Sequence, residues 1–294
     1  MKNFLEYYYN FLNITVHEKD KMYYFYYNNS LYTFVKANRS REEILVISRM
    51  NLVNYNKIIL NIRGEVITFY NNIPYVLIRN LYSNKILNTY PKHNSNIFIT
   101  KDMSILMRNN WYLLITRKID YLEYQRNHLK NRDKTLLTSF DYYIGMAENS
   151  VSYFNSAIKS VKPADIDRLS ITHRRIYSLN YNNYYDPLSI VIDHESRDIS
   201  EYLKYIFLKD EYDINTLKRF FDSLNLSQYG YLLLYSRMLY PSFYFDSYEN
   251  IVNNNKSVKE LVKIIKRSSE YEEYLNTIYK LINRKIKIPK VDWV

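Results

Sequence analysis

The segment from His173 to Asp198 constrains the fold of this 294-residue chain more than any other. After His173-Arg-Arg the chain reaches Asn180, and the apolar run Leu188–Ile192 then leads directly into Asp193. A short apolar, β-branched run between polar residues is typical of a buried strand. We therefore expect a strand that carries the Asp193 carboxylate at its end, with a histidine, an asparagine and a second carboxylate close by in the sequence.

This spacing resembles the catalytic centre of the small-molecule kinases that are similar to aminoglycoside phosphotransferases. Their pattern is His-Gly-Asp, an Asn seven residues after the His, and a strand that ends at a metal-binding Asp. Here His173, Asn180 and Asp193 keep those positions, but Arg175 stands where the catalytic Asp would be. A guanidinium stays protonated at physiological pH and cannot accept a proton from a substrate hydroxyl. The resemblance therefore implies a kinase scaffold that has lost its base.

Longer stretches resemble the YutH-like spore coat proteins, which are related to the CotS-type spore coat kinases of endospore-forming bacteria. These stretches are Trp111–Glu123, Phe140–Asn149, Asp193–Lys204 and Leu234–Asp246. The resemblance implies an α+β, two-lobed, protein-kinase-like fold with a β-rich first lobe and a helical second lobe. It also implies synthesis in the mother cell, deposition in the spore coat, and other spore coat proteins as partners.

The first eighty residues carry the local signals of a β-rich lobe. Residues 22–27 and 31–36 predict a hairpin that turns at Asn28-Asn29-Ser30, because Asn tolerates left-handed backbone geometry. The sequence Ser40-Arg-Glu-Glu43 predicts a capping box that opens a helix reaching about Met50.

Three further β segments are expected before the first lobe ends. Residues 58–62 and 66–70 predict a second hairpin that turns at Arg63-Gly64, and residues 74–79 predict another strand. The expected boundaries are a β-rich lobe over 1–79, a connector over 80–88 and a mainly helical lobe over 89–294.

Apolar residues recur with helical spacing in three later segments, which predicts amphipathic helices. The three predicted faces are Trp111, Ile115, Ile119 and Leu122; Phe140, Tyr143, Ile144, Ala147, Val151, Phe154 and Ile158; and Tyr271, Tyr274, Leu275, Ile278, Leu281 and Ile282. A second capping box, Ser257-Val-Lys-Glu260, is expected to open a short helix before the last one.

An active phosphotransferase of this kind needs phosphate contacts, a lysine held by a glutamate, metal ligands and a base. No glycine precedes Gly64, so the loop that lets backbone amides approach phosphates is absent from the sequence. Lys36, late in a strand, is the candidate nucleotide-binding lysine, and Glu43 is the nearest acid that could hold it. The alternative, which we favour, is a solvated lysine at a strand edge, since Glu43 is already expected to cap a helix.

Asn180 and Asp193 keep the positions of the metal pair and are the candidate metal and nucleotide ligands. A lone carboxylate and an amide make a poor magnesium site unless phosphate oxygens complete it. We expect Arg174 and Arg175 to pair with Asp193 or Asp198, which would fill the cleft with an ion pair where a metal would otherwise bind.

The remaining polar residues of the segment are expected to have structural roles. His173 is more often a packed, hydrogen-bonded histidine than a catalytic one, and Asp198 would lie inside the first turn of a helix, where backbone amides stabilise an acid. If the chain is nonetheless an enzyme, Asp186 and Glu195 are the nearest carboxylates that could replace the missing base.

Composition narrows the function further. The absence of cysteine excludes disulfides, thiolate metal sites and cysteine nucleophiles. No apolar run approaches the roughly 18 residues of a membrane span, and the first residues lack a secretion signal, so we expect the chain to stay where it is made. The 35 tyrosines fit the codon bias of an AT-rich genome; packing or oxidative cross-linking of exposed tyrosines in a coat is the alternative.

The net charge of +11 favours an anionic partner such as nucleic acid, a phosphorylated ligand or an acidic protein. No nucleic-acid motif accompanies the basic residues, so a solvated basic face is favoured. Three functions remain open. The leading one is a pseudokinase that binds and assembles in the coat, with no cofactor required and at most weak nucleotide binding. The others are an active atypical kinase that uses ATP and Mg, and a basic nucleic-acid-binding protein.

Overall fold

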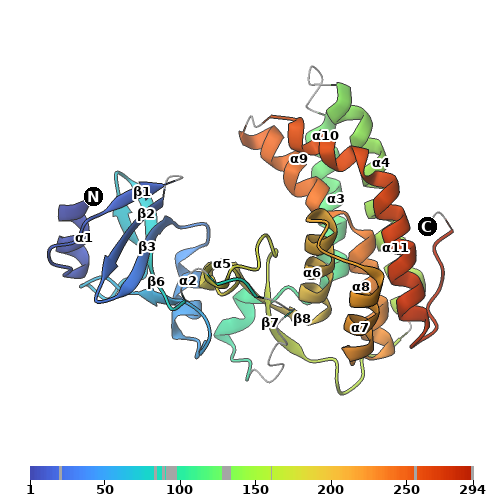
Figure 1. The fold of residues 1–294 in the computed structure, drawn as a ribbon, viewed down its shortest axis with the longest axis horizontal. Helices are drawn as coiled ribbons and strands as arrows, with labels where there is room; N and C mark the ends of the chain where they lie inside the picture. The colour runs from blue at the N-terminus through green and yellow to red at the C-terminus, as the bar shows by residue number, and fades with distance from the viewer. Residues whose placement is uncertain are drawn as a thin grey trace. The chain divides into compact units, whose positions relative to one another are not determined.

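A computed structural model describes residues 1–19, 22–82, 85–87, 90, 98–127, 134–159, 161–254 and 257–292 (Figure 1). The chain divides into two compact units, Met1–Met107 with Ile171–Ile192, and Arg108–Ser170 with Asp193–Val294. The unit that contains the amino-terminal sheet thus extends to Met107 and also includes residues 171–192. The lobe boundaries given above remain a prediction. Residues 83, 84 and 88 of the predicted connector lie outside the described residues.

The first unit is built on a six-stranded antiparallel sheet. Five strands follow the order β1 (His17–Lys19), β2 (Met22–Tyr27), β3 (Ser30–Lys36), β6 (Ile73–Asn80) and β4 (Lys57–Ile59), and β5 (Thr68–Tyr70) also pairs with β6. The predicted first hairpin is confirmed, since β2 and β3 are joined through the pair Tyr27↔Ser30. Asn28 and Asn29 have φ values of 47° and 57°, the left-handed geometry that made this turn predictable.

The predicted second hairpin is wrong, because β4 and β5 each pair with β6 and not with one another. Strand β3 occupies one edge of β6 along its length. A strand has only two edges, so β4 and β5 share the other one, β4 opposite Leu77–Arg79 and β5 opposite Ile73–Tyr75. The tight turn itself forms, with Gly64 at φ 75°. The predicted last strand of this lobe is confirmed as β6.

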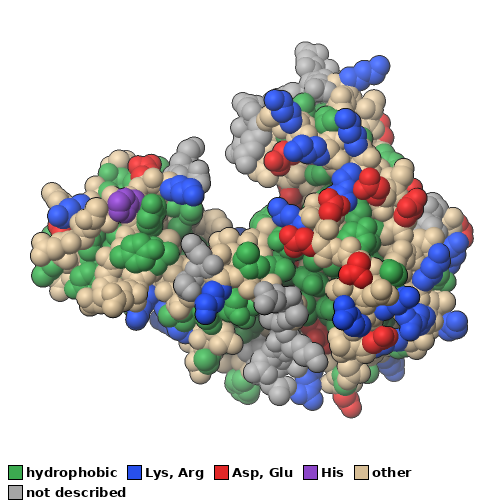
Figure 2. Space-filling model, in the orientation of Figure 1, with side chains coloured by type: hydrophobic (Ala, Val, Ile, Leu, Met, Phe, Trp, Pro, Cys, Tyr) green, Lys and Arg blue, Asp and Glu red, His purple; other side chains and the backbone are tan. Residues whose placement is uncertain are grey.

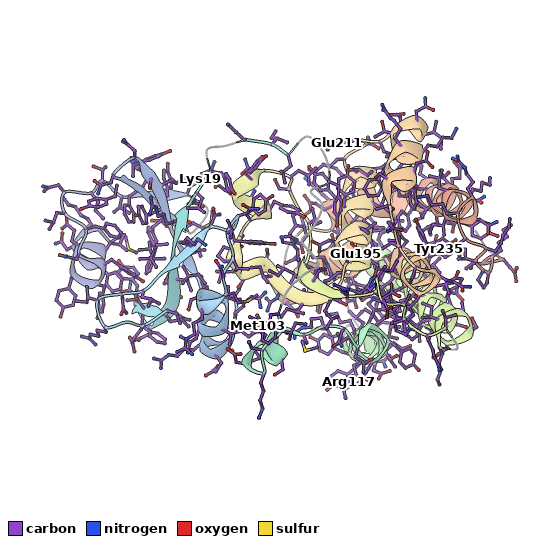
Figure 3. All side chains as sticks on the ribbon, turned by 90° about the horizontal axis from the view of Figure 1, so that it is seen from below. Lys19, Met103, Arg117, Glu195, Glu211 and Tyr235 are labelled. Carbon is purple, nitrogen blue, oxygen red and sulfur yellow. The ribbon has the colours of Figure 1, made fainter. Side chains whose placement is uncertain are left out.

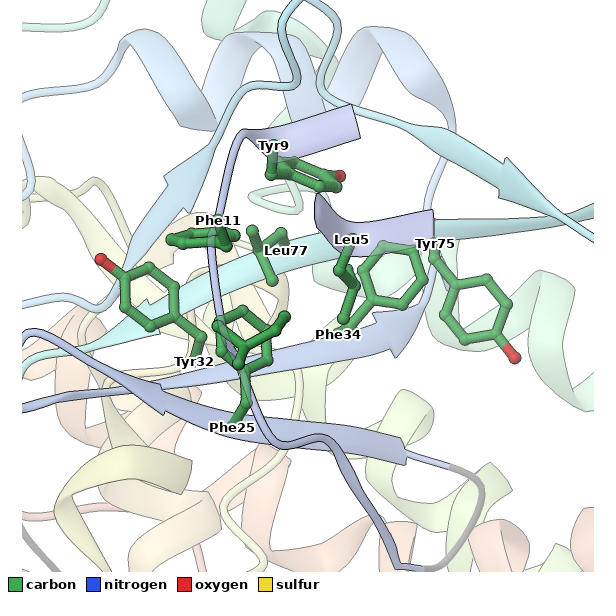
Figure 4. Close-up of a cluster of buried hydrophobic side chains, with 9 residues drawn as sticks. Leu5, Tyr9, Phe11, Phe25, Tyr32, Phe34, Tyr75 and Leu77 are labelled. Atoms are coloured by element: carbon green, nitrogen blue, oxygen red, sulfur yellow. The ribbon is translucent and has the colours of Figure 1, made fainter. Parts of the chain in front are cut away.

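Two helices cover opposite faces of this sheet. Helix α1 (Lys2–Tyr9) packs on an aromatic cluster that includes Leu5, Tyr9, Phe34 and Leu77 (Figure 4). On the other face, Ile44 of helix α2 (Arg41–Arg49) belongs to a buried cluster with Val66, Val76 and Ile78, and Val35 packs against it. Neighbouring residues of β3 therefore point to different helices, as the alternation of a strand requires.

Helix α2 begins with the predicted capping box. The Glu43 backbone N–H donates to Ser40 Oγ over 3.2 Å, and the Ser40 N–H donates to Glu43 Oε2 over 3.3 Å. Both contacts satisfy amides that have no partner inside the helix. This prediction from four residues is confirmed.

Short elements lie before the helices of the second unit and in the segment that carries the candidate site. They are η1 (Asp102–Leu106), β7 (Leu169–His173), α5 (Tyr181–Tyr184), η3 (Pro187–Ser189) and β8 (Ile190–His194). Strands β7 and β8 pair as a two-stranded sheet, and the division between the two units falls inside these strands. The predicted strand before Asp193 starts at Ile190, because Pro187 and Asp186 open a 3-10 turn over the preceding residues.

The second unit is helical. Its helices are α3 (Trp111–Asn127), α4 (Lys134–Tyr153) with the π-helical turn η2 (Phe154–Ile158), α6 (Ser196–Leu208), α7 (Ile214–Ser223), α8 (Gln228–Leu239), α9 (Ser242–Asn254), α10 (Lys259–Lys266) and α11 (Ser268–Asn283). Helix α8 is buried from Gly230 to Leu239, which makes it the centre of this unit. Within the described residues, none of the helices has the length and apolarity of a membrane span.

The predicted helical faces agree with the burial of the side chains to different degrees. All six residues predicted for α11 are buried, and so are Trp111, Ile119 and Leu122 of α3. Ile115 of α3 is only half-buried. Of the face predicted over α4 and η2, Phe140, Tyr143, Ala147 and Ile158 are buried, whereas Ile144, Val151 and Phe154 are half-buried. Met146, Ser150 and Tyr153 are buried on α4 without having been predicted. The capping box predicted at Ser257 is wrong: α10 begins at Lys259 with Val258 as its N-cap residue and without a side-chain cap.

Candidate functional site

The loop after β7 corresponds to the predicted catalytic segment. Its backbone is anchored in the first unit by the Arg174 N–H, which donates to the Ser189 carbonyl over 2.8 Å. Asn180 caps α5, with its Oδ1 accepting from the Asn182 N–H over 3.0 Å. The side chain of this candidate metal ligand therefore already has a local structural role.

His173 ends β7 and is 1% exposed. Its Nε2 lies 3.3 Å from the Tyr55 hydroxyl, and its ring centroid is 4.4 Å from that of Tyr184. These contacts fit the packed, hydrogen-bonded histidine that the sequence favoured over a catalytic one.

A pocket of about 440 Å³ opens beside this loop, within the first unit. Its lining includes His173, Arg174, Arg175, Ser178, Asp186 and Ser189. The pocket thus contains the position at which a catalytic carboxylate was expected, and the residue there is Arg175. A carboxylate, Asp186, lies in the same lining.

Asp186 is the N-cap residue of η3, and its Oδ1 accepts from the Leu188 N–H over 3.0 Å. Burial raises the pKa of Asp186, while the Leu188 N–H, Arg39 and His173 oppose that rise. Burial therefore outweighs the neighbouring positive groups and favours the neutral carboxyl. Glu195, the other spare carboxylate, is the N-cap residue of α6 in the second unit (Figure 3).

Glu43, the acid that was considered as a partner for Lys36, contacts two arginines. Its Oε1 lies 3.5 Å from Arg39 Nη1 and 3.7 Å from Arg174 Nη2. Lys36 is exposed, and strand alternation places it with Phe34 on the face that α1 covers, opposite α2. Among the described residues Lys36 makes no ion pair, and the Lys36–Glu43 contact does not form.

Asp193, in the second unit, is fully buried at the end of β8. Its Oδ1 accepts from Arg237 Nη2 over 2.9 Å and from the His194 N–H over 2.7 Å. Its Oδ2 accepts from Arg197 Nη1 over 3.1 Å. Both carboxylate oxygens therefore contact a guanidinium, one from α8 and one from α6.

Arg237 is itself deeply buried, with 4% of its side chain exposed, and its guanidinium lies 5.8 Å from the ring centroid of Trp111. Burial lowers the pKa of Arg237, and the Asp193 carboxylate opposes that change. Two guanidiniums beside one carboxylate stabilise its charge without a metal ion.

The neutralisation of Asp193 by arginine was predicted, but from Arg174 or Arg175. The structure assigns this role to Arg197 and Arg237, and Arg174 contacts Glu43 instead. Arg197 lies four residues after Asp193, so the spacing in the sequence could have indicated this pair. Arg237 lies 44 residues away from Asp193, and nothing in the local sequence indicated their contact.

Asp198 lies in the first turn of α6, as predicted, where backbone amides stabilise an acid. Its side chain is also fully buried. One turn further, Glu201 lies 3.8 Å from Lys204 Nζ, which donates to Ser242 Oγ over 3.1 Å. The sequence did not indicate this buried polar chain.

The polar side chains of the candidate site do not form a set of ligands for a divalent cation. Within the described ranges, no cluster of three or more His, Asp or Glu side chains could hold a metal ion. Asp193 is already paired with two cations, and the Asn180 side chain caps a helix. A divalent cation prefers several oxygen ligands and would have to displace these guanidiniums, so the residues present do not fit it.

Solved structures of similar fold are kinases of small molecules. An aminoglycoside phosphotransferase from Alicyclobacillus acidocaldarius superposes with a TM-score of 0.54 at 10% identity, over 95% of this chain and 94% of that one. The amicoumacin kinase hAmiN, solved with AMP-PNP and Ca2+, gives 0.53 at 12% identity over 99% and 95%. Spectinomycin phosphotransferase APH(9)-Ia, solved with ADP and spectinomycin, gives 0.51 at 12% over 97% and 93%. These similarities confirm the predicted kinase-like α+β fold.

Relatives in sequence define the family. The chain is 32% identical to the endospore coat-associated protein YutH of Bacillus subtilis (strain 168) over 178 residues, which is 55% of this chain. The match spans about half of that relative, 52% of its length. A family model described as "Spore coat putative kinase YutH" matches residues 2–278. The chain therefore belongs to the YutH family of spore coat proteins, as the sequence resemblance predicted.

Proposed function

We propose that this chain is a pseudokinase of the spore coat, a kinase-like protein that binds other coat proteins during assembly and transfers no phosphate. We place the chain in the coat because its Bacillus subtilis relative is named as an endospore coat-associated protein. On this proposal the chain is made in the mother cell, needs no cofactor, and binds nucleotide weakly or not at all.

The state of Asp193 carries the proposal. A kinase uses a carboxylate at this position to hold Mg2+ against the phosphates of ATP. Here the carboxylate is buried and both of its oxygens contact guanidiniums of Arg197 and Arg237. A metal ion would have to displace two guanidiniums from a buried carboxylate and leave them without a partner, which is costly. Arg175 at the base position adds a second, independent obstacle.

An active atypical kinase is the second candidate, and one observation favours it. Asp186 lines the same pocket as His173 and Arg175, and burial raises its pKa. A carboxylate of raised pKa is a better general base near neutral pH. Such an enzyme would require ATP and Mg2+.

Incubation with labelled ATP, Mg2+ or Mn2+ and spore coat extract tests the two candidates. We expect no phosphate transfer above background, while a fluorescent fusion of the same chain collects around the forespore in sporulating cells. Transfer that disappears in both Asp193→Ala and Asp186→Asn, but persists in the exposed control Asp222→Ala, would establish the enzyme instead. A fusion that stays diffuse throughout the mother cell would contradict the role in the coat.

The basic composition gives little support to binding of nucleic acid. On the face drawn in Figure 2, Lys and Arg side chains alternate with Asp and Glu over the helical unit and form no continuous basic patch there. Nucleic-acid-binding proteins concentrate their positive charge on one face.

A further inference from the structure

A pocket of about 450 Å³ lies in the first unit, where β2 turns into β3 and β6 ends. Helix α5 also contributes to its walls. The lining includes two aromatic rings and several groups that form hydrogen bonds, which are Tyr26, Tyr82, Ser30, Arg79, Asn80 and Asn182. This pocket is separate from the one beside the loop after β7, since the two share no described residue.

Asn56 holds the walls of this pocket in place. It is 3% exposed, and its Nδ2 donates to the Asn182 carbonyl over 3.0 Å and to Asn80 Oδ1 over 3.3 Å. Its Oδ1 accepts from the Leu81 N–H over 2.9 Å. Helix α5 and the end of β6 are therefore joined through one buried amide, so the pocket is formed before a ligand arrives.

Arg79 is the one charged side chain among the described residues of the lining. Its Nε and Nη2 donate to Ser30 Oγ over 3.2 Å and 3.0 Å, which orders the guanidinium. In the described part of the chain Arg79 forms no ion pair, and strands β2, β3 and β6 contain no Asp or Glu. Nη1 and the second hydrogen of Nη2 therefore remain for an anion.

Asn182 carries a buried acceptor that lacks a donor. Its Oδ1 is buried and, within the described ranges, accepts no hydrogen bond. A buried acceptor without a donor destabilises a folded protein, so its presence in the lining of a pocket indicates that a ligand supplies the donor.

We infer that this pocket binds the carboxylate of a peptide segment from a partner protein. The guanidinium of Arg79 binds the carboxylate, and a peptide N–H of the same segment donates to Asn182 Oδ1. The inference rests on the proposed function, because it names the chemistry of a coat partner and the surface that receives it.

A carboxylate fits this lining better than a phosphate. One guanidinium balances one negative charge, and its planar fork matches two carboxylate oxygens. A phosphate dianion would keep a second negative charge that no described side chain of the lining balances. A peptide fits better than a small anion, because Tyr26, Leu31 and Tyr82 can pack against its apolar side chains.

Calorimetric titration of the full chain with three peptides tests the inference. The first is acetyl-Phe-Ala-Leu with a free carboxylate, the second is the same peptide amidated at its end, and the third is amidated acetyl-Phe-Glu-Leu. We expect saturable binding, millimolar or tighter, of at least one of the two charged peptides, and about tenfold weaker binding of the neutral one. Comparison of the two charged peptides distinguishes a carboxyl terminus from an acidic side chain.

Arg79→Gln removes the charge but keeps an amide that can donate to Ser30. It should weaken binding of the charged peptide about tenfold or more, the value of a charge-assisted hydrogen bond, and leave binding of the neutral peptide unchanged. Arg63→Gln is the matched control, since Arg63 is an exposed arginine of the same unit that lies over the Tyr8 ring, outside the pocket.

Asn182→Leu separates binding from stability. Leucine has a similar volume and removes the acceptor that lacks a donor, so the urea midpoint should stay the same or rise. Binding of the charged peptide should nonetheless weaken, because its N–H loses the acceptor. A lower midpoint together with unchanged peptide binding would contradict the role given to Asn182.

Equal binding of the charged and neutral peptides, equal weakening by Arg79→Gln and Arg63→Gln, or no saturable binding of any peptide would overturn the inference. Adenosine that binds more tightly than the peptides and is insensitive to Arg79→Gln would assign the pocket to a nucleoside and overturn it as well. Such a failure leaves the pseudokinase proposal intact if phosphate transfer is also absent. Phosphate transfer with normal peptide binding would overturn only the pseudokinase proposal.

Discussion

Replacement of Arg237 by methionine is the perturbation that most directly tests how Asp193 is stabilised. Methionine has a similar length and no charge, so it keeps much of the packing inside the helical unit. It removes the contact of 2.9 Å to Asp193 Oδ1 and the position of a cation over Trp111. The fully buried carboxylate then keeps Arg197 and the His194 N–H as its partners.

The expected loss is large because the pair is buried. Removing one partner of a buried ion pair costs roughly 3–5 kcal/mol, and a cation over an aromatic ring contributes about 0.5–2 kcal/mol. Arg197 still neutralises Asp193, so the lower part of the first range applies. We expect Arg237→Met to reduce the free energy of unfolding by about 3 kcal/mol.

Urea denaturation followed by tryptophan fluorescence and circular dichroism measures this change, as a lower midpoint at an unchanged slope. The control is Arg284→Met, because Arg284 forms an exposed pair with Asp222 at 4.0 Å and such pairs contribute at most about 1 kcal/mol. The double variant Asp193→Asn/Arg237→Met should cost less than the sum of the two single variants, because both single changes break the same buried contact. A loss no greater than that of the control would refute the neutralisation of Asp193 by Arg237.

Two further predictions concern the first unit. Burial raises the pKa of Tyr9 to about 12, although its hydrogen bond to Thr68 opposes the rise. The stability that depends on the neutral Tyr9 hydroxyl is complete below pH 10 and is lost as the pH rises toward 12. The loss of stability between about pH 10 and pH 12 should therefore be smaller in Tyr9→Phe. Equal alkaline sensitivity in both proteins would contradict this. Ser40→Ala removes the acceptor for the Glu43 N–H and should lower the free energy of unfolding, measured by urea denaturation, by about 1 kcal/mol. Ser48→Ala is the control, because the Ser48 hydroxyl donates to the Leu45 carbonyl of the same helix and does not cap it.

Local signals predicted the elements whose energetics are local. The turn at Asn28-Asn29, the capping box at Ser40 and the apolar face of α11 each depend on residues a few positions apart. The turn geometry of asparagine, a side-chain cap and a helical repeat act within one or two turns of the backbone. The family resemblance supplied the fold, which the solved kinases confirm.

Competition between distant segments decided what the local signals missed. Residues 58–62 and 66–70 have the pattern of a hairpin, but β6 offers them a free edge, and both of the resulting strands pair there. The sequence showed that side chains alternate along β3, but it did not show which face of the sheet α2 would cover. Lys36 therefore lies opposite α2, while Arg39 and Arg174 contact Glu43.

The sequence by itself predicted a strand running into Asp193, which β8 confirms, and it placed Arg175 where the family resemblance implies a catalytic acid. It also determined that buried acids in this segment would need positive partners, because a carboxylate is not left uncompensated in an apolar core. Which arginine meets which acid was decided only by the tertiary structure. Helix α8 packs so that Arg237 reaches Asp193 from 44 residues away, since the pairing of buried charges depends on distance in space and not on separation along the chain.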